Sequence, residues 1–174
     1  RITASHEPCL VITDARMGEV YVAEYDFDKL GVAQAILPDV SELTNQFKES
    51  FIYYKPKDVV SGDFYRAAKL SNGNFALLTA DSTGHGVPGA IMSILNISCL
   101  KESVKEGILQ PADILNRTRK LIIDTLALDG SVEGGKDGMD ASLTIYDFAN
   151  KKLIVSSANN PVWIIRGNET IEIK

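Results

Sequence analysis

The chain has 174 residues, enough for one domain with a single hydrophobic core. Its 45% hydrophobic and 24% charged residues are typical of a globular protein, and its net charge of −5, with the basic residues dispersed, argues against nucleic acid as the main partner. Two cysteines exclude a disulfide framework and no apolar run is long enough to span a membrane, so we expect a cytoplasmic domain, whose parent chain could still be membrane-tethered.

The hydrophobic pattern predicts strands first, then a pair of helices, then strands again. The strands expected before the helix pair are 9–13, 20–25, 51–55, 62–70 and 74–81, with a further helix at 32–48. The helix pair is expected at 88–106 and 111–128, and the last strands at 140–147, 152–157, 162–166 and 170–173. This order predicts an α+β layered domain, because a parallel sheet would need strands and helices in alternation.

The paired helices carry apolar residues at helical spacing, which predicts an inner face for each. In the first helix these residues are Ile91, Met92, Ile94, Leu95 and Leu100. In the second they are Ile114, Leu115, Leu121, Ile122 and Leu126. We expect both stripes to cover one layer of the domain, with Cys99 as a small core residue, although the same helices could in principle present a regulatory surface or a homodimer contact.

The segment 62–81 predicts a β-hairpin whose loop length decides where two aspartates lie. If the loop has two residues, Asp63 lies opposite Ser82 and Asp81 faces the other way. If it has three, with Gly73 in the left-handed conformation, Asp63 lies directly opposite Asp81. Carboxylates that close repel unless a cation or a proton lies between them, and Mg²⁺ or Mn²⁺ would suit such an oxygen site. The alternative is two ordinary aspartates that cap turns.

Residues 81–89 (DSTGHGVPG) lead from a strand into a helix. Gly84 and Gly86 let the backbone bend sharply, and the N–H groups at the helix start favour an anion such as phosphate. The glycine spacing is that of a P-loop, but Ala90 stands where the P-loop needs a lysine. A tight turn without a ligand would use the same glycines. His85 could be a general acid, a metal ligand or a turn residue.

The segment 129–138 (DGSVEGGKDG) has four glycines and three acids, which predicts an irregular, mobile loop near the mouth of the site. Together with Asp140 it has part of the spacing of a calcium-binding EF-hand loop. The last position of such a loop calls for a glutamate, however, and a strand follows where a helix should begin. We therefore expect no calcium site here.

Four segments together resemble the SpoIIE-like branch of the type-2C (PPM family) metal-dependent protein serine/threonine phosphatases. They are KPKDVVSGDFY at 55–65, ADSTGHGVPGA at 80–90, GMDASL at 138–143 and ANNP at 158–161. They occur in the order of the family, with the helix pair between the second and the third. The resemblance implies an αββα sandwich of two mostly antiparallel sheets flanked by helices, with the site at one edge of the sheets.

The resemblance also implies two Mn²⁺ or Mg²⁺ ions bridged by a water molecule that attacks phosphoserine or phosphothreonine. Position by position, Asp63 matches the first metal ligand, Asp81 the bridging ligand and the backbone carbonyl of Ser82 a further ligand. Asp140 is the nearest additional acid in the sequence. Asn159 falls where eukaryotic relatives place an aspartate for a third metal ion, so we expect at most an auxiliary role for each of these two residues.

Two further residues depart from the family pattern. In the wider type-2C group a histidine follows the bridging aspartate by two residues, whereas His85 follows Asp81 by four, which weighs against a general-acid role. Arg66 replaces an aromatic residue that commonly follows Asp-Phe-Tyr in this branch. The family's Ser-Asp-Gly segment and its last aspartate ligand are expected beyond residue 174, so the resemblance implies a domain that is incomplete at its C-terminus and has little activity by itself.

The resemblance covers about residues 34–174, and residues 1–33 are left as an unassigned N-terminal extension or linker. The chain begins with Arg1, so we expect it to be part of a longer bacterial signalling protein with an upstream sensor domain. The predicted substrate is a phosphorylated protein, for which the family precedent is the antagonist of an anti-sigma factor. The alternatives are a catalytically weak phosphatase-like module that binds a protein partner and a calcium-responsive binding protein.

Overall fold

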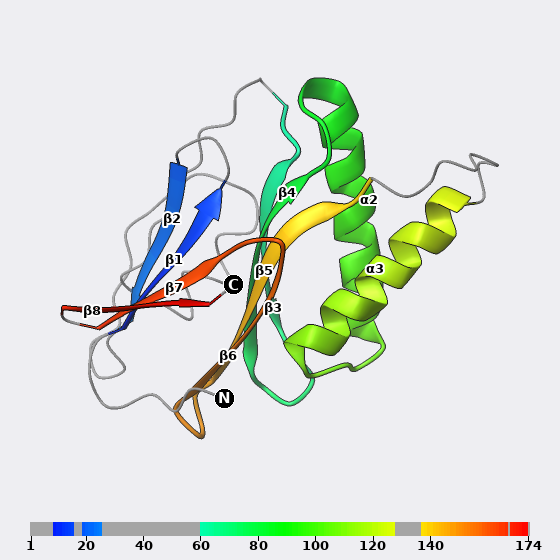
Figure 1. The fold of residues 1–174 in the computed structure, drawn as a ribbon. Helices are drawn as coiled ribbons and strands as arrows, with labels where there is room; N and C mark the ends of the chain where they lie inside the picture. The colour runs from blue at the N-terminus through cyan, green and yellow to red at the C-terminus, as the bar shows by residue number, and fades with distance from the viewer. Residues whose placement is uncertain (1–8, 16–18, 26–59, 128–136, 167, 174) are drawn as a thin grey trace.

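The structure is a computed structural model that describes residues 9–15, 19–25, 60–127, 137–166 and 168–173. Two four-stranded antiparallel sheets pack face to face, and two helices cover the outer face of one of them (Figure 1). This arrangement confirms the predicted α+β sandwich. A helical layer on the second sheet is not seen among the described residues. Nor is any helix in these ranges long and apolar enough to cross a membrane.

The first sheet carries the candidate site and consists of two hairpins. Its strands are β3 (Asp63–Lys69), β4 (Phe75–Ser82), β5 (Met139–Asp147) and β6 (Lys152–Ala158), in the order β3-β4-β5-β6. The helix pair connects β4 to β5, so residues far apart in the sequence become direct neighbours in the sheet.

The second sheet joins the two ends of the chain. Its strands are β1 (Cys9–Ala15), β2 (Glu19–Tyr25), β7 (Val162–Arg166) and β8 (Glu169–Ile173), in the order β2-β1-β7-β8. Because β1 pairs with β7, two strands from the predicted extension 1–33 share a sheet with strands of the 34–174 segment. The boundary at residue 33 lies outside the described residues and stays a prediction.

The space between the sheets is filled by large side chains that project from both. Tyr146 is stacked on Phe148 with ring centroids 6.1 Å apart, and Phe75 tilts against Tyr146 at 6.0 Å. Val162 and Ile164 close this core from the second sheet. Burial of aromatic side chains contributes strongly to stability, so this cluster anchors the sandwich below the edge that carries the aspartates.

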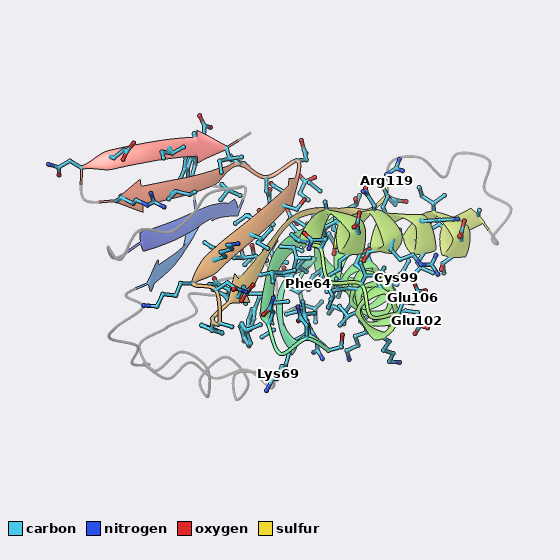
Figure 2. The ribbon with its side chains drawn as sticks, turned by 90° about the horizontal axis from the view of Figure 1, so that it is seen from below. Phe64, Lys69, Cys99, Glu102, Glu106 and Arg119 are labelled. Atoms are coloured by element: carbon cyan, nitrogen blue, oxygen red, sulfur yellow. The ribbon has the colours of Figure 1, made fainter. Side chains whose placement is uncertain are left out.

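Helices α2 (Gly86–Lys105) and α3 (Pro111–Ala127) bury the other face of the first sheet. Pro111 opens α3 as predicted, because a proline has no N–H to lose at the first helical position. Of the predicted α3 stripe, Ile114 and Ile122 are fully buried, and Thr118 lies between them. Figure 2 shows Phe64 on the side of the sheet toward the helices and Glu102 and Glu106 on the far side of α2.

The predicted inner stripe of α2 is wrong for its first half. Ile91 and Ile94 are 61% and 65% exposed, and only Leu100 of that stripe is fully buried. The buried face is instead mostly small and polar, made of Gly89, Ser93, Asn96, Cys99, Leu100 and Ser103. Small side chains let the helix approach the strand ends closely, which a row of isoleucines would prevent. Cys99 is a core residue as predicted, and burial raises the pKa of its thiol.

Several predictions fall on residues that are not described. They are the helix at 32–48, the strand at 51–55 and the loop before Asp137. The remaining elements match the prediction to within two residues at each end, with α2 beginning at Gly86 instead of residue 88. A proline is accommodated in the first turn of a helix, so Pro88 did not mark its first residue.

Three glycines pack backbone against backbone where β3 begins and α2 starts. A Cβ atom added at Gly89 would lie 2.4 Å from the carbonyl oxygen of Gly84 and 3.1 Å from the nitrogen of Gly62. One added at Gly62 would lie 2.7 Å from the carbonyl oxygen of Ser82. These contacts involve only backbone atoms, so neither position can accept a side chain unless the strand end and the helix move apart.

We therefore expect Gly89→Ala to lower the free energy of unfolding by about 1–3 kcal/mol, the usual effect of forced overpacking. Denaturant unfolding monitored by circular dichroism measures this change. Gly138→Ala is the matched control, since an added Cβ there meets nothing within 4 Å. Equal stability of the Gly89→Ala and Gly138→Ala chains would contradict the close packing described here.

Candidate functional site

The β3–β4 hairpin has the three-residue loop, one of the two alternatives allowed by the sequence. The N–H of Leu70 donates to the carbonyl of Asn74 at 2.8 Å, and Gly73 takes a φ of 85°, in the left-handed region. Glycine is favoured there because it has no Cβ to clash. With this loop Asp63 pairs with Asp81 in the register of the two strands. The predicted pairing is confirmed.

The register extends the pair into a row. Asp81 also pairs with Asp140 at the start of β5, so three aspartates lie side by side on three adjacent strands. At the next strand the side-chain amide of Asn159 donates to a carboxylate oxygen of Asp140 at 2.9 Å. Asn159 follows β6 and has a φ of 59°, a conformation that asparagine adopts more readily than most residues. The fold therefore brings both predicted auxiliary residues to the aspartate pair.

The face on which the row lies follows from the alternation of side chains along a strand. Phe64, Ala80 and Ala141, each next in sequence to one of the aspartates, belong to the core beneath the helices. The three aspartates therefore project from the opposite face, toward the second sheet. They lie at the start of β3, the end of β4 and the start of β5, which is one edge of the sandwich, and all three are half-buried.

The row is an alignment of like charges. Side chains directly opposite in antiparallel strands have Cβ atoms about 4.5–5.5 Å apart, so the outer two aspartates are separated by about 10 Å. Within the described ranges, no group of three or more His, Cys, Asp or Glu side chains is arranged to hold a metal ion. The three carboxylates thus form an open row along the edge of the sheet.

The loop after β4 carries the remaining predicted residues. Ser82 is buried, and its N–H donates to the carbonyl of Gly62 at 3.2 Å. Gly84 and Gly86 have φ values of 93° and 60°, which explains the need for glycine at both positions. His85 occupies the N-cap position of α2, is exposed, and makes no capping hydrogen bond with its side chain. Its position is that of a turn residue, and its chemical role stays a prediction.

A second loop is tied to this one from across the sheet. The N–H of Thr83 donates to the carbonyl of Gly138 at 3.0 Å, and the N–H of Gly138 donates to the hydroxyl of Thr83 at 3.0 Å. At the third strand end, the hydroxyl of Ser61 accepts from the N–H of Asp63 at 3.0 Å. These bonds fix the backbone beside each aspartate.

Sequence reasoning missed the residues of α2 that support these strand ends, namely Ser93 and Asn96. Both are buried; the amide of Asn96 donates to two segments that flank the aspartates, and the hydroxyl of Ser93 lies 3.4 Å from the carbonyl of Ser61. The available signal was the polar spacing of Ser93, Asn96 and Ser103 along one helix face. The isoleucines of the same helix have a more conventional helical spacing, which masks this signal in the sequence.

A cavity of about 380 Å³ lies on the opposite face of the sheet, between α3 and strands β5 and β6. Its wall is mostly apolar, with Arg119 and Asp137 among its polar residues. The sheet separates this cavity from the aspartate row, since Ala141, which lines it, faces away from Asp140.

Comparisons with known proteins agree with the fold. A family model described as Stage II sporulation protein E (SpoIIE) matches residues 71–174. The solved structure of the SiaA-PP2C domain of Pseudomonas aeruginosa is similar, with 30% sequence identity and a TM-score of 0.60. The alignment covers 71% of this chain and 48% of that one, so the present chain spans about half of its length. A search of curated proteins gives no match.

The row predicts that Asp81→Asn does not destabilise the metal-free chain. Asp81 lies between two carboxylates, and directly opposed like charges are destabilising by about 0.2–1 kcal/mol per pair. We expect the melting temperature in the presence of a chelator to stay the same or to rise.

Asp147→Asn, at the other end of β5, is the control for this measurement. Hydrogen bonds from the side chain and then the backbone N–H of Asn150 lower the pKa of Asp147, so its charge supports the fold above its unfolded pKa. Its replacement should lower the melting temperature at neutral pH. A loss from Asp81→Asn as large as that from Asp147→Asn would contradict the repulsion within the row.

Proposed function

Because the chain belongs to the SpoIIE family and has a type-2C phosphatase-like fold, we propose that it hydrolyses phosphoserine or phosphothreonine on a signalling protein in a reaction dependent on Mn²⁺ or Mg²⁺. The observation that carries this proposal is the row of Asp63, Asp81 and Asp140 along one sheet edge. Three neighbouring carboxylates destabilise the metal-free fold, and such an arrangement is retained where a cation offsets the repulsion.

The donor set fits hard divalent cations. Carboxylate and carbonyl oxygens are the ligands that Mg²⁺ and Mn²⁺ prefer, and the described edge offers no thiolate that would favour a softer metal. Asp63 and Asp81 would hold the ions, with the carbonyl of Ser82 as a further ligand. The central position of Asp81, with a carboxylate on either side, is the one that a bridging ligand requires.

Asp140 and Asn159 would support this pair. The amide of Asn159 orients the Asp140 carboxylate through its hydrogen bond, and a ligand whose other oxygen is held in this way keeps a defined direction. When bound, a pair of divalent ions supplies an activated water and neutralises charge on the phosphoryl group. The residues of the chain then have to place the phosphoryl group.

The loop after Ser82 would receive the phosphate. Gly84 and Gly86 keep the approach to the backbone N–H groups at the start of α2 free of side chains, and the N-terminus of this long helix favours an anion. His85 is exposed beside these glycines, where it could donate a proton to the serine or threonine oxygen as the P–O bond breaks. The first turn of α2 has no acidic residue that would repel a phosphate.

The substrate is proposed from the family alone. The present chain spans about half of the SiaA-PP2C structure to which it is similar, so the activity of the whole protein is itself part of the proposal. A phosphorylated signalling protein in the cytosol, such as the antagonist of an anti-sigma factor, fits the family precedent.

One observation favours a second candidate function, a phosphatase-like module that binds a protein partner with little catalysis. The described residues contain no group of three acidic, His or Cys side chains arranged to hold a metal ion. If the carboxylates do not close around a cation, the fold would still present its loops to a partner. Metal titration separates the two functions.

We expect isothermal titration calorimetry to detect weak Mn²⁺ binding to the chain and a sensitive colorimetric assay to detect slow phosphate release from a phosphoserine peptide in the presence of Mn²⁺. Asp81→Asn should weaken Mn²⁺ binding and phosphate release by more than about 100-fold, since loss of a ligand costs at least as much as loss of its supporting partner. Asp147→Asn, remote from the edge, should change neither value.

Absence of Mn²⁺ and Mg²⁺ binding to a folded chain would contradict the phosphatase proposal and favour the binding module. Phosphate release that is unchanged in Asp81→Asn would show that the aspartate row is not the site.

A further inference from the structure

We propose that Asn96 of α2 is a positioning residue, which holds the strand ends that carry Asp81 and Asp140 at the spacing needed for metal binding. The inference rests on the proposed function, but the contacts of Asn96 are independent of it. Asn96 is 0% exposed and lies on the inner face of the helix, directly behind the site edge.

Both contacts of the Asn96 amide go to segments next to an aspartate. Its nitrogen lies 2.9 Å from the hydroxyl oxygen of Ser82 and 3.1 Å from the carbonyl oxygen of Gly138. Ser82 follows Asp81 directly, and Gly138 precedes Asp140 by two residues. The carbonyl of Gly138 can only accept, so the atom that faces it must be the NH₂ donor, and the orientation of the amide is defined.

The same two segments are joined by the Thr83–Gly138 bonds. The carbonyl of Gly138 accepts from the N–H of Thr83 and from the amide of Asn96, so one oxygen connects the loop, the helix and the start of β5. Loss of the Asn96 donor would leave the pairing of β4 with β5 and the Thr83 contacts, which are exposed to water, as the links between the two strand ends. Exposed hydrogen bonds open more easily than buried ones.

One turn earlier in α2, Ser93 contacts the segment that leads into β3. Its hydroxyl lies 3.4 Å from the carbonyl of Ser61 and donates at 2.8 Å to the carbonyl of Ala90 in its own helix. Ser61 in turn accepts from the N–H of Asp63. Thus one face of α2 contacts the flank of every aspartate in the row, with Asn96 serving two of them and Ser93 the third.

Packing alone does not account for an asparagine at this place. Among the described residues the Oδ1 atom of Asn96 is a buried acceptor with no hydrogen-bond partner. A buried polar atom without a partner is costly, and an apolar residue would avoid that cost. The presence of Asn96 is therefore explained by the two hydrogen bonds that its amide donates to the strand ends of the site.

Residues that position metal ligands without binding the metal affect metal affinity and activity by a typical amount. Partners that orient metal ligands typically change metal affinity or activity by about 10–100-fold when they are removed. We expect Asn96→Ala to weaken Mn²⁺ binding by at least about tenfold, because the segments of Ser82 and Asp140 gain freedom relative to each other.

The test compares Asn96→Ala with Ser103→Ala in the full 174-residue chain. Ser103 lies two turns further along the same helix face, is 0% exposed, and bonds to Cys99 and to Thr118 of α3, away from the strand ends. Both variants remove a buried polar group, so loss of stability alone should appear in both. Only Asn96→Ala should loosen the site edge.

Two readouts are measured for each chain. Hydrogen exchange of the metal-free proteins should show at least about tenfold faster exchange for the amides of residues 82–84 and 138–140 in Asn96→Ala, with β7 unchanged. Calorimetric titration with Mn²⁺ should show weaker binding in Asn96→Ala and wild-type binding in Ser103→Ala. If Asn96→Ala does not fold, Ser82→Ala replaces it, since that change removes one of the two acceptors and keeps the backbone carbonyl.

Unchanged exchange at residues 82–84 and 138–140, or equal Mn²⁺ affinity of the Asn96→Ala and wild-type chains, would overturn the inference. A wild-type chain that binds no Mn²⁺ overturns the proposed function instead. In that case the exchange data still decide whether Asn96 holds the two strand ends together.

Discussion

The repulsion between Asp63, Asp81 and Asp140 is the constraint on which the rest of this structure depends. Like charges on directly opposed positions are unfavourable, and the register of three strands imposes them all the same. The surrounding fold has to hold the strand ends against that repulsion. Three features hold the strand ends in place: an aromatic core between the sheets, backbone-to-backbone contacts between glycines, and hydrogen bonds from α2. Such an edge has a clear use if a divalent cation neutralises it, which is the basis of the proposed phosphatase activity.

The composition of α2 follows from the same constraint. A helix that only covered a sheet would turn its isoleucines inward, yet here Val87, Ile91 and Ile94 are more than 60% exposed and the inner face is mostly small and polar. The first turn has to approach the strand ends to within backbone contact, and the next turns have to donate hydrogen bonds to them. Both requirements exclude bulky apolar side chains, so the helix loses hydrophobic burial at the site end and recovers it at Leu100.

The row also explains how residues from distant parts of the chain form one site. Asp63 and Asp81 are brought together by a local hairpin, whereas Asp140 and Asn159 arrive only after the helix pair has returned the chain to the sheet. The bonds of Thr83 and Asn96 to Gly138 connect these two halves. Membership of the SpoIIE family and similarity to the SiaA-PP2C domain agree with the fold, while the titrations test the metal-dependent reaction.

The sequence by itself determined the element order and the inner face of α3, because both follow from hydrophobic periodicity. It reduced the position of Asp63 to two alternatives, and the three-residue loop of the folded hairpin decided that Asp63 pairs with Asp81. The sequence also predicted a sharp bend at Gly84 and Gly86, both of which take a positive φ in the structure. Only the tertiary structure decided that Asp140 extends the pair and that Asn96 joins the two loops, since both facts depend on the register between β4 and β5 across a long connection. The tertiary structure also decided that the polar face of α2 is the buried one. Which face of a helix is buried depends on the segments it packs against, and these segments come together only when the chain folds.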